Sequence, residues 1–201
     1  LRARKVPVLP ALFQQGGALA FASSKLQKDP KLANIAVQRN GRALAFVGDY
    51  LQGEKEVVLV AVKQDGMALQ WASPYLKGDK EVVLAAVTQN GLAIQYASDE
   101  FKDDLDVVLA AVKQNGYAIQ LMDIQNWSFE KRKSVVLEAV TCQGLALRYA
   151  RLAMKSDKEV VLAAVKQNGG ALDLASEELQ NTKEVVLAAV AQEGGALVYA
   201  S

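Results

Sequence analysis

Histidine is absent from the 201 residues of the chain, and cysteine occurs once, as Cys142. The chain therefore lacks the commonest general base and metal ligand, and one thiol completes neither a Cys/His zinc site nor an internal disulfide. With no histidine to activate it, we expect Cys142 to be an incidental small residue rather than a nucleophile. No Gly-rich loop has phosphate-binding spacing. The sequence predicts no catalytic, metal or cofactor site, and we expect that the protein is not an enzyme.

Long apolar runs and fields of one charge sign are also missing. The longest apolar runs are six residues, as in 57–62, far below the ~18 needed to span a bilayer. The formal net charge is +1 and the two signs are interleaved, so no field gathers nucleic acid. The chain begins at Leu1 without a charged segment before an apolar core, so we expect no intact signal peptide. We expect a soluble, folded protein with no transmembrane segment and no nucleic-acid partner.

What the chain does contain is a tandem repeat that covers nearly its whole length. A fixed period in the range of 20 to 50 residues is typical of a solenoid. We interpret residues 1–201 as one repeat domain of eight units, with one three-residue insertion within 123–128. Pro7 and Pro10 predict an irregular start to the first unit. The period is 25 residues except for one gap of 28, counted between the glycines that mark the units: Gly16, Gly41, Gly66, Gly91, Gly116, Gly144, Gly169 and Gly194.

Each unit carries signals for a pair of helices. Asp79 can cap a first helix of roughly ten residues, and Asp29-Pro30 is a stronger form of the same start; Thr182 holds the cap position in the last unit. Asn90-Gly91 predicts a helix end at which the glycine is left-handed. A second helix of about two turns follows over 92–97, and then a connector that suits a turn of 3₁₀ helix. One apolar residue recurs in the connectors, as Leu26, Leu51, Leu76, Phe101, Met154 and Leu179.

These signals favour an all-α solenoid of eight helix-turn-helix repeats of about 25 residues. The alternative is an α/β horseshoe like that of leucine-rich repeats, in which the Val-Val-Leu-Ala-Ala-Val segments form strands. Against it stand the Asp-Pro start, the paired alanines, and the lack of a Leu-x-x-Leu-x-Leu alternation.

Two nearly intact copies of the repeat, Asp79–Ser98 and Asp157–Ser176, carry a family resemblance. Their pattern, Asp-Lys-Glu-Val-Val-Leu-Ala-Ala-Val-x-Gln-Asn-Gly, resembles the repeat of domain of unknown function 4116. The resemblance covers most of the chain and implies no activity, so it transfers no catalytic residue. Such repeats are frequent in unicellular algae and some bacteria. Their architecture also looks like the leucine-rich-variant type of solenoid, by analogy only.

The unit between Gly116 and Gly144 departs from the repeat. Its insertion brings in Trp127, followed by Lys131-Arg132-Lys133 before a helix whose siblings begin with acidic residues. We expect Ser134 to cap a slightly shortened helix. Trp127 with its basic neighbours is either an anchor for a partner or a plug, together with Phe129, for the gap made by the insertion. By contrast, we expect Trp71 to lie in the core.

A polar stripe along the first helices is the more general candidate for a binding surface. Stacked in a solenoid, these stripes form an extended face of the kind by which repeat proteins hold partners, or they are simply the side that faces water. The candidates on this stripe are Glu81, Thr88, Gln89, Lys113, Gln114, Lys166 and Gln167.

We therefore expect a non-enzymatic scaffold for protein–protein interaction. The alternative is a soluble peripheral structural subunit of a large membrane complex, placed in an algal plastid by the distribution of the resembling family. The sequence does not name the protein partner.

Overall fold

The computed structural model describes residues 16–122, 124 and 126–200, and no strand occurs within these ranges. The prediction of an all-α fold is confirmed. The alternative, an α/β horseshoe with strands, is not supported. The chain divides into two compact units, Leu1–Phe101 and Lys102–Ser201, here unit 1 and unit 2. The predicted irregular start at Pro7 and Pro10 lies outside the described residues.

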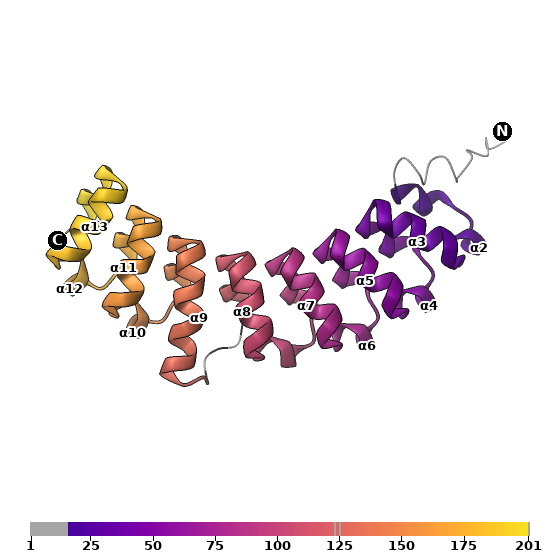
Figure 1. Ribbon diagram of the computed structural model, residues 1–201, viewed down its shortest axis with the longest axis horizontal. Helices are drawn as coiled ribbons and strands as arrows, with labels where there is room; N and C mark the ends of the chain where they lie inside the picture. Colours follow the sequence, from indigo (N-terminus) through magenta and orange to yellow (C-terminus); the bar gives the residue numbers. More distant parts are fainter. Residues whose placement is uncertain (1–15, 123, 125, 201) are drawn as a thin grey trace. The chain divides into compact units, whose positions relative to one another are not determined.

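Each repeat consists of three short helical segments in a fixed order (Figure 1). A main α-helix is followed by a 3₁₀ helix, and a shorter helix then leads into the next repeat. Unit 1 has the main helices α3 (Pro30–Arg39), α5 (Lys55–Gln64) and α7 (Lys80–Gln89). Its 3₁₀ helices are η1 (Gly16–Phe21), η2 (Gly41–Phe46), η3 (Gly66–Trp71) and η4 (Gly91–Tyr96), and its short helices are α2 (Ser24–Gln27), α4 (Asp49–Gln52) and α6 (Pro74–Lys77).

Unit 2 repeats this order with one altered copy. Its main helices are α8 (Leu105–Gln114), α9 (Phe129–Cys142), α11 (Lys158–Gln167) and α13 (Lys183–Gln192). Its 3₁₀ helices are η6 (Gly116–Leu121), η7 (Gly144–Tyr149), η8 (Gly169–Leu174) and η9 (Gly194–Tyr199), and its short helices are α10 (Leu152–Lys155) and α12 (Glu177–Gln180). The segment that leads to α8 is a 3₁₀ turn, η5 (Asp99–Lys102).

Aspartate caps start α3, α7, α8 and α11 as predicted, whereas Glu54 and Ser128 precede α5 and α9. Asp79 Oδ1 accepts hydrogen bonds from the backbone N–H groups of Glu81 and Val82, at 3.0 and 3.2 Å. These bonds satisfy two donors that have no partner inside the helix. The predicted length is also confirmed, since α7 has 10 residues. Thr182 is an exception, because its hydroxyl donates to the Glu178 carbonyl oxygen instead of capping α13.

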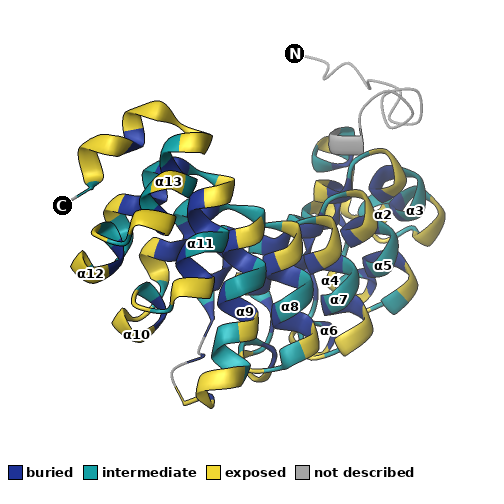
Figure 2. Cartoon of the chain, turned by 60° about the vertical axis from the view of Figure 1, so that its left-hand side comes forward, coloured by how far each residue is buried: buried dark blue, intermediate teal, exposed yellow. Residues whose placement is uncertain are grey.

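The core lies between a layer of main helices and a layer of 3₁₀ helices (Figure 2). Within unit 1, α3, α5 and α7 pack side by side, and so do the 3₁₀ helices that follow them. Val82, Val83 and Ala86 of α7 are fully buried. Trp71 was expected in the core but is only half-buried. It ends η3, and Phe46 and Tyr149, which end η2 and η7, are exposed.

The segments assigned to the second helix and to the connector have exchanged helix types. The second segment is a 3₁₀ helix, and where Asn or Asp precedes it that side chain caps its first turn: Asn90 Oδ1 accepts from Leu92 N–H at 3.1 Å. The connector, expected as a 3₁₀ turn, is a four-residue α-helix in α2, α4, α6, α10 and α12, and is the predicted 3₁₀ turn in η5. Its apolar residue fills the core as predicted, with Leu76 and Met154 almost wholly buried.

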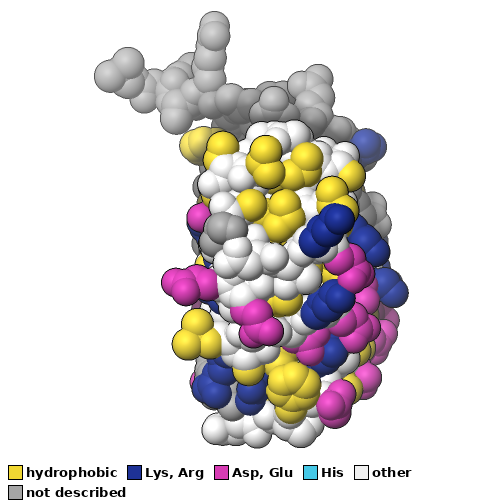
Figure 3. All heavy atoms as spheres, turned by 90° about the vertical axis from the view of Figure 1, so that its left-hand side faces the viewer, with side chains coloured by type: hydrophobic (Ala, Val, Ile, Leu, Met, Phe, Trp, Pro, Cys, Tyr) yellow, Lys and Arg dark blue, Asp and Glu magenta, His cyan; other side chains and the backbone are white. Residues whose placement is uncertain are grey.

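Within each unit, a repeat is covered by the next one along the chain. Leu172 in η8 is 0% exposed beneath α13 and η9, whereas Leu197, its equivalent in η9, is 60% exposed. Figure 3 faces this last repeat and shows hydrophobic side chains gathered on it. Since fully burying a leucine contributes about 1.5–3 kcal/mol, stacking between repeats carries much of the stability.

Candidate interaction surface

Glutamines at the ends of the main helices join consecutive repeats. Gln89 Oε1 of α7 accepts a hydrogen bond from the N–H of Gly66 in the preceding repeat at 2.5 Å. Gln167 accepts from the N–H of Gly144 in the same way, also at 2.5 Å. Gln114, another candidate on the polar stripe, also has an interaction partner. At least two of the glutamines proposed as contacts for a partner therefore already stabilise the stack.

The repeated glycine faces the same junction. A Cβ atom placed at Gly66 would lie well under 3.0 Å from the Ala86 carbonyl oxygen of the next main helix. No glycine among the described residues has a positive φ, so the predicted left-handed helix end is wrong. Glycine is required here by the close approach of two backbones rather than by its conformational freedom.

Ion pairs form a second connection between repeats, at the start of the main helices. Lys55 Nζ lies 2.8 Å from both Asp79 Oδ2 and Glu81 Oε2 of the next repeat. The hydrogen bond from Lys55 lowers the pKa of Asp79, and the two carboxylates raise the pKa of Lys55 to about 12. Glu81, a candidate for partner binding, is therefore held in this cluster. Lys158 pairs with Glu184 in the same way at 2.6 Å.

Lys133 of the irregular repeat belongs to this series of ion pairs. Its Nζ lies 2.7 Å from Asp157 Oδ2 and 2.8 Å from Glu159 Oε2, and these carboxylates raise its pKa. Burial opposes the ionisation of Asp157, but the hydrogen bond and charge of Lys133 and the backbone N–H groups of Val160 and Glu159 together outweigh burial and lower the pKa of Asp157. Lys133 therefore occupies the position that Lys55 occupies in its own repeat.

The irregular repeat has a longer main helix than its siblings, not the shortened one expected. Helix α9 has 14 residues and begins at Phe129, where the Ser128 hydroxyl accepts the N–H of Lys131 at 3.3 Å. The segment that is a separate short helix elsewhere is fused to it. Ser134 lies inside this helix and donates to the Lys131 carbonyl oxygen rather than capping. The basic residues are thus part of α9 instead of preceding it.

Trp127 is only 7% exposed and lies against α9, while Phe129 is exposed. The Lys131 ammonium sits 3.5 Å from the centre of the indole ring, a cation–π contact. Arg132 donates to the carbonyl oxygens of Trp127, at 2.8 Å, and Ile124, at 3.3 Å. The structure therefore brings Trp127, Lys131 and Arg132 together around the backbone before α9. Asp123 and Gln125, within the predicted insertion, lie outside the described residues.

Cys142 takes the place of the joining glutamine in α9. Its thiol donates to the Lys113 carbonyl oxygen at 3.4 Å, and Gln143 Oε1 accepts the N–H of Tyr117 at 3.1 Å. Burial and the charge of Glu138 raise the pKa of the Cys142 thiol, partly opposed by Lys113. A raised pKa disfavours the reactive thiolate.

The outward side of the main helices keeps the candidates Thr88, Lys113 and Lys166 on the surface. Four positions recur on it with the spacing i, i+3, i+4, i+7, which places them on one face of a helix. In α5 they are Glu56, Leu59, Val60 and Lys63; in α7 they are Glu81, Leu84, Ala85 and Thr88; in α11 they are Glu159, Leu162, Ala163 and Lys166. The first and last positions are exposed, and the two apolar ones are half-exposed.

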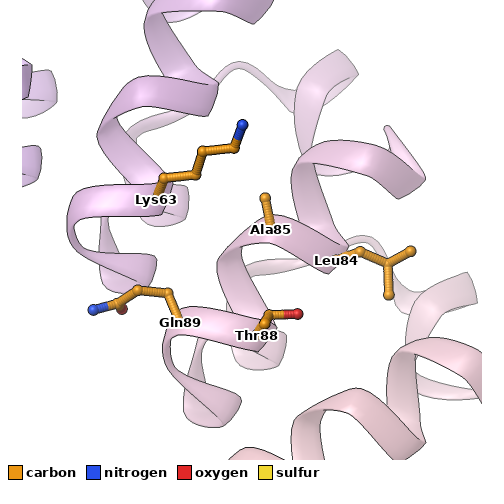
Figure 4. Close-up of a pocket in the computed structure, with 5 residues that line it drawn as sticks. All are labelled: Lys63, Leu84, Ala85, Thr88 and Gln89. Atoms are coloured by element: carbon orange, nitrogen blue, oxygen red, sulfur yellow. The ribbon is translucent and has the colours of Figure 1, made fainter.

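A shallow depression of about 480 Å³ lies on this outward side in unit 1 (Figure 4). It is lined by Lys63 of α5 and by Leu84, Ala85, Thr88 and Gln89 of α7. In Figure 4 the Lys63 side chain extends from α5 toward Ala85. The sequence predicted Thr88 and Gln89 as candidates here but not Leu84.

Two other kinds of feature are absent from the described residues. Within them no group of three or more His, Cys, Asp or Glu side chains could hold a metal ion. None of the helices described is both long and apolar enough to cross a membrane.

The stacked three-helix repeats define a helical solenoid. The chain belongs to the family described as domain of unknown function (DUF4116), whose model matches residues 30–77, 54–102, 79–125, 132–180 and 157–201. The matched segments overlap and begin at different repeats, as expected for a tandem array. No curated protein and no solved structure was found to match the chain.

Proposed function

We propose that the protein is a non-enzymatic scaffold that holds a protein partner against the outward side of its main helices. The observation that carries this proposal is the recurring stripe of two half-exposed apolar residues between exposed polar ones, as in α5 and α7. A helix face that is exposed only to water is not expected to repeat leucine and valine at these positions. Repeat proteins use such extended surfaces to hold partners.

The non-enzymatic part of the proposal is supported by the roles that the titratable groups already have. Asp79 and Asp157 cap main helices and lie in ion pairs with lysines. Structural ion-pair networks shift pKa values as catalytic sites do. The ion pairs with lysines and the helix caps account for the lowered pKa values of these two aspartates. A peripheral structural subunit in an algal plastid remains a prediction from the sequence, because no described feature favours that location.

Site-specific photo-crosslinking in native cells tests the scaffold. A photoreactive phenylalanine analogue is placed at Thr88 on the outward side of α7, or at Tyr75 on the short helix α6 as the matched control. Both positions are exposed. We expect one protein to crosslink from Thr88 and not from Tyr75, and the purified pair to bind in solution. Equal crosslinking from both positions, or none from Thr88, would contradict the proposal.

A further inference from the structure

The apolar stripes of unit 1 join into a strip that crosses three main helices. We call it the apolar strip; its half-exposed members are Ile35 of α3, Leu59 and Val60 of α5, and Leu84 and Ala85 of α7. Because α3, α5 and α7 pack side by side, the strip continues from one repeat to the next. In unit 2 Glu138 of α9 occupies one of these apolar positions, so a carboxylate interrupts the corresponding strip. In unit 1 the first apolar position of α3 is taken by the uncharged Asn34, so the strip of unit 1 contains no charged residue.

An acidic rim borders the apolar strip at the start of α5 and α7. It consists of Glu56 and Glu81, both exposed. Lys55 neutralises part of the charge of Glu81 and Asp79, whereas Glu56 is in no ion pair among the described residues. Lys31 takes the rim position in α3, so the acidic rim is confined to α5 and α7.

A basic rim borders the strip at the other end of the helices. It consists of Lys63 of α5 and of Arg39 of α3, which follows Gln38, the equivalent of Lys63; both basic residues are exposed and in no ion pair among the described residues. The nearby Arg42 is already paired with Asp65 at 2.7 Å, so this pair adds no net charge. Thr88 is the neutral rim residue in α7.

The spacing of the two rims fits the width of an α-helix. Glu56 and Lys63 are seven residues apart, which corresponds to about 10.5 Å along α5, and a helix with its side chains is ~10–12 Å across. Main helices pack ~8–10 Å apart, so the strip positions of successive repeats are separated by roughly this distance. One heptad of a helix lying across them has about the same length, so its apolar face would meet each main helix once per heptad. A partner helix of about three to four turns would span α3, α5 and α7.

We infer that the apolar strip of unit 1 docks an amphipathic α-helix of a partner, with basic residues along one flank and acidic residues along the other. This inference rests on the proposed scaffold function and names the partner's chemistry. The helix lies across α3, α5 and α7, with its apolar face on Val60 and Ala85. Its basic flank lies over the acidic rim and its acidic flank over the basic rim, which fixes its direction.

Three synthetic helical peptides of ~18 residues, with the same apolar stripe, test this inference on the full chain. The first has one Lys flank and one Glu flank, the second has Glu on both flanks, and the third has Lys on both. Simple exchange of the flanks is no control, because a helix bound in the reverse direction restores the match. By fluorescence anisotropy at low salt we expect the mixed peptide to bind about fivefold more tightly than the others. The difference should shrink in high salt.

Two charge reversals then invert the preference. Glu56→Lys combined with Glu81→Gln makes both rims basic, so the peptide with two Glu flanks should become the tightest. Lys63→Glu combined with Arg39→Glu makes both rims acidic, so the peptide with two Lys flanks should take its place. Lys25→Glu, on the exposed side of α2, is the matched control and should change nothing. Thermal unfolding of each variant confirms that the fold is retained.

Equal binding of the three peptides, or a preference that neither reversal inverts, overturns the docked helix. So does sedimentation that shows a second copy of the chain on this surface, as a dimer that Lys63→Glu dissociates. If a partner still crosslinks from Thr88 while the peptide results contradict the inference, the scaffold function is supported and only the docked helix is wrong. If neither crosslinking nor peptide binding gives the expected result, the proposed function is wrong as well.

Discussion

Replacing Gly66 with alanine tests the close backbone contact between repeats. The new Cβ would collide with the Ala86 carbonyl oxygen and also lie 3.0 Å from Gln89 Oε1. The oxygen belongs to the backbone of α7 and cannot rotate away, so the next repeat must shift. Overpacking of this kind costs about 1–3 kcal/mol, and we expect a value near the upper end. For a chain of this size that corresponds to a fall in Tm of roughly 5–10 °C.

Gly194→Ala is the matched control, because it makes the same change at the same position of the last repeat. Nothing lies within 4 Å of a Cβ at Gly194. Because neither glycine has a positive φ, alanine is not strained by the backbone at either site. We expect Gly194→Ala to leave the free energy of unfolding in urea unchanged or to raise it by about 0.4–1 kcal/mol. Equal losses in the two variants, or no loss at Gly66, would refute the contact.

Three further predictions address the other connections. Gln89→Ala should lower the free energy of unfolding by about 1–2 kcal/mol, because it leaves a buried glycine N–H without its acceptor, whereas Thr88→Ala should change it by less than ~0.5 kcal/mol. Ser128→Ala should cost about 1 kcal/mol by removing the cap of α9, and hydrogen exchange should show fraying at the start of that helix, while Ser134→Ala should not. The pKa of Asp79 is lower in the folded state than in the unfolded state, so the ionised Asp79 stabilises the fold above its unfolded-state pKa. This stabilisation is lost as the pH falls through the folded-state pKa. Urea denaturation between pH 2 and 6 should therefore show a shallower acid loss for Asp79→Asn; an unchanged pH profile would contradict the ion pair.

The period of the sequence predicted most of the fold. A 25-residue repeat with Asp caps, a Val-Val-Leu-Ala-Ala-Val segment and a glycine located the main helices, as α7 shows at Lys80–Gln89. These features are local, so they can be read from a single unit.

The contacts between repeats could not be predicted in the same way. The role of Gly66 depends on a carbonyl oxygen of the following repeat, and Gln89 looked like a surface residue because its acceptor role needs that neighbour. The fused helix α9 was missed for a similar reason. Its basic residues seemed unfavourable beside a helix start, but Ser128 moves the start upstream and Lys133 is neutralised by Asp157 and Glu159.

The candidate surface was predicted in part. The exposed Thr88, Lys113 and Lys166 follow from helical periodicity alone. Leu84 was not among the predicted candidates, because leucine is usually buried, yet the face of α7 that carries it is half-exposed. Its position in the depression beside Lys63 appears only when two repeats are stacked.

The central claim is that the outward side of the main helices is the functional surface. Its most direct test is a hydrogen-exchange footprint of the chain with and without the partner identified by crosslinking. We predict slower exchange in α3, α5 and α7 and unchanged exchange in the short helices α4 and α6. Protection confined to α4 and α6, or to the 3₁₀ helices, would contradict the claim.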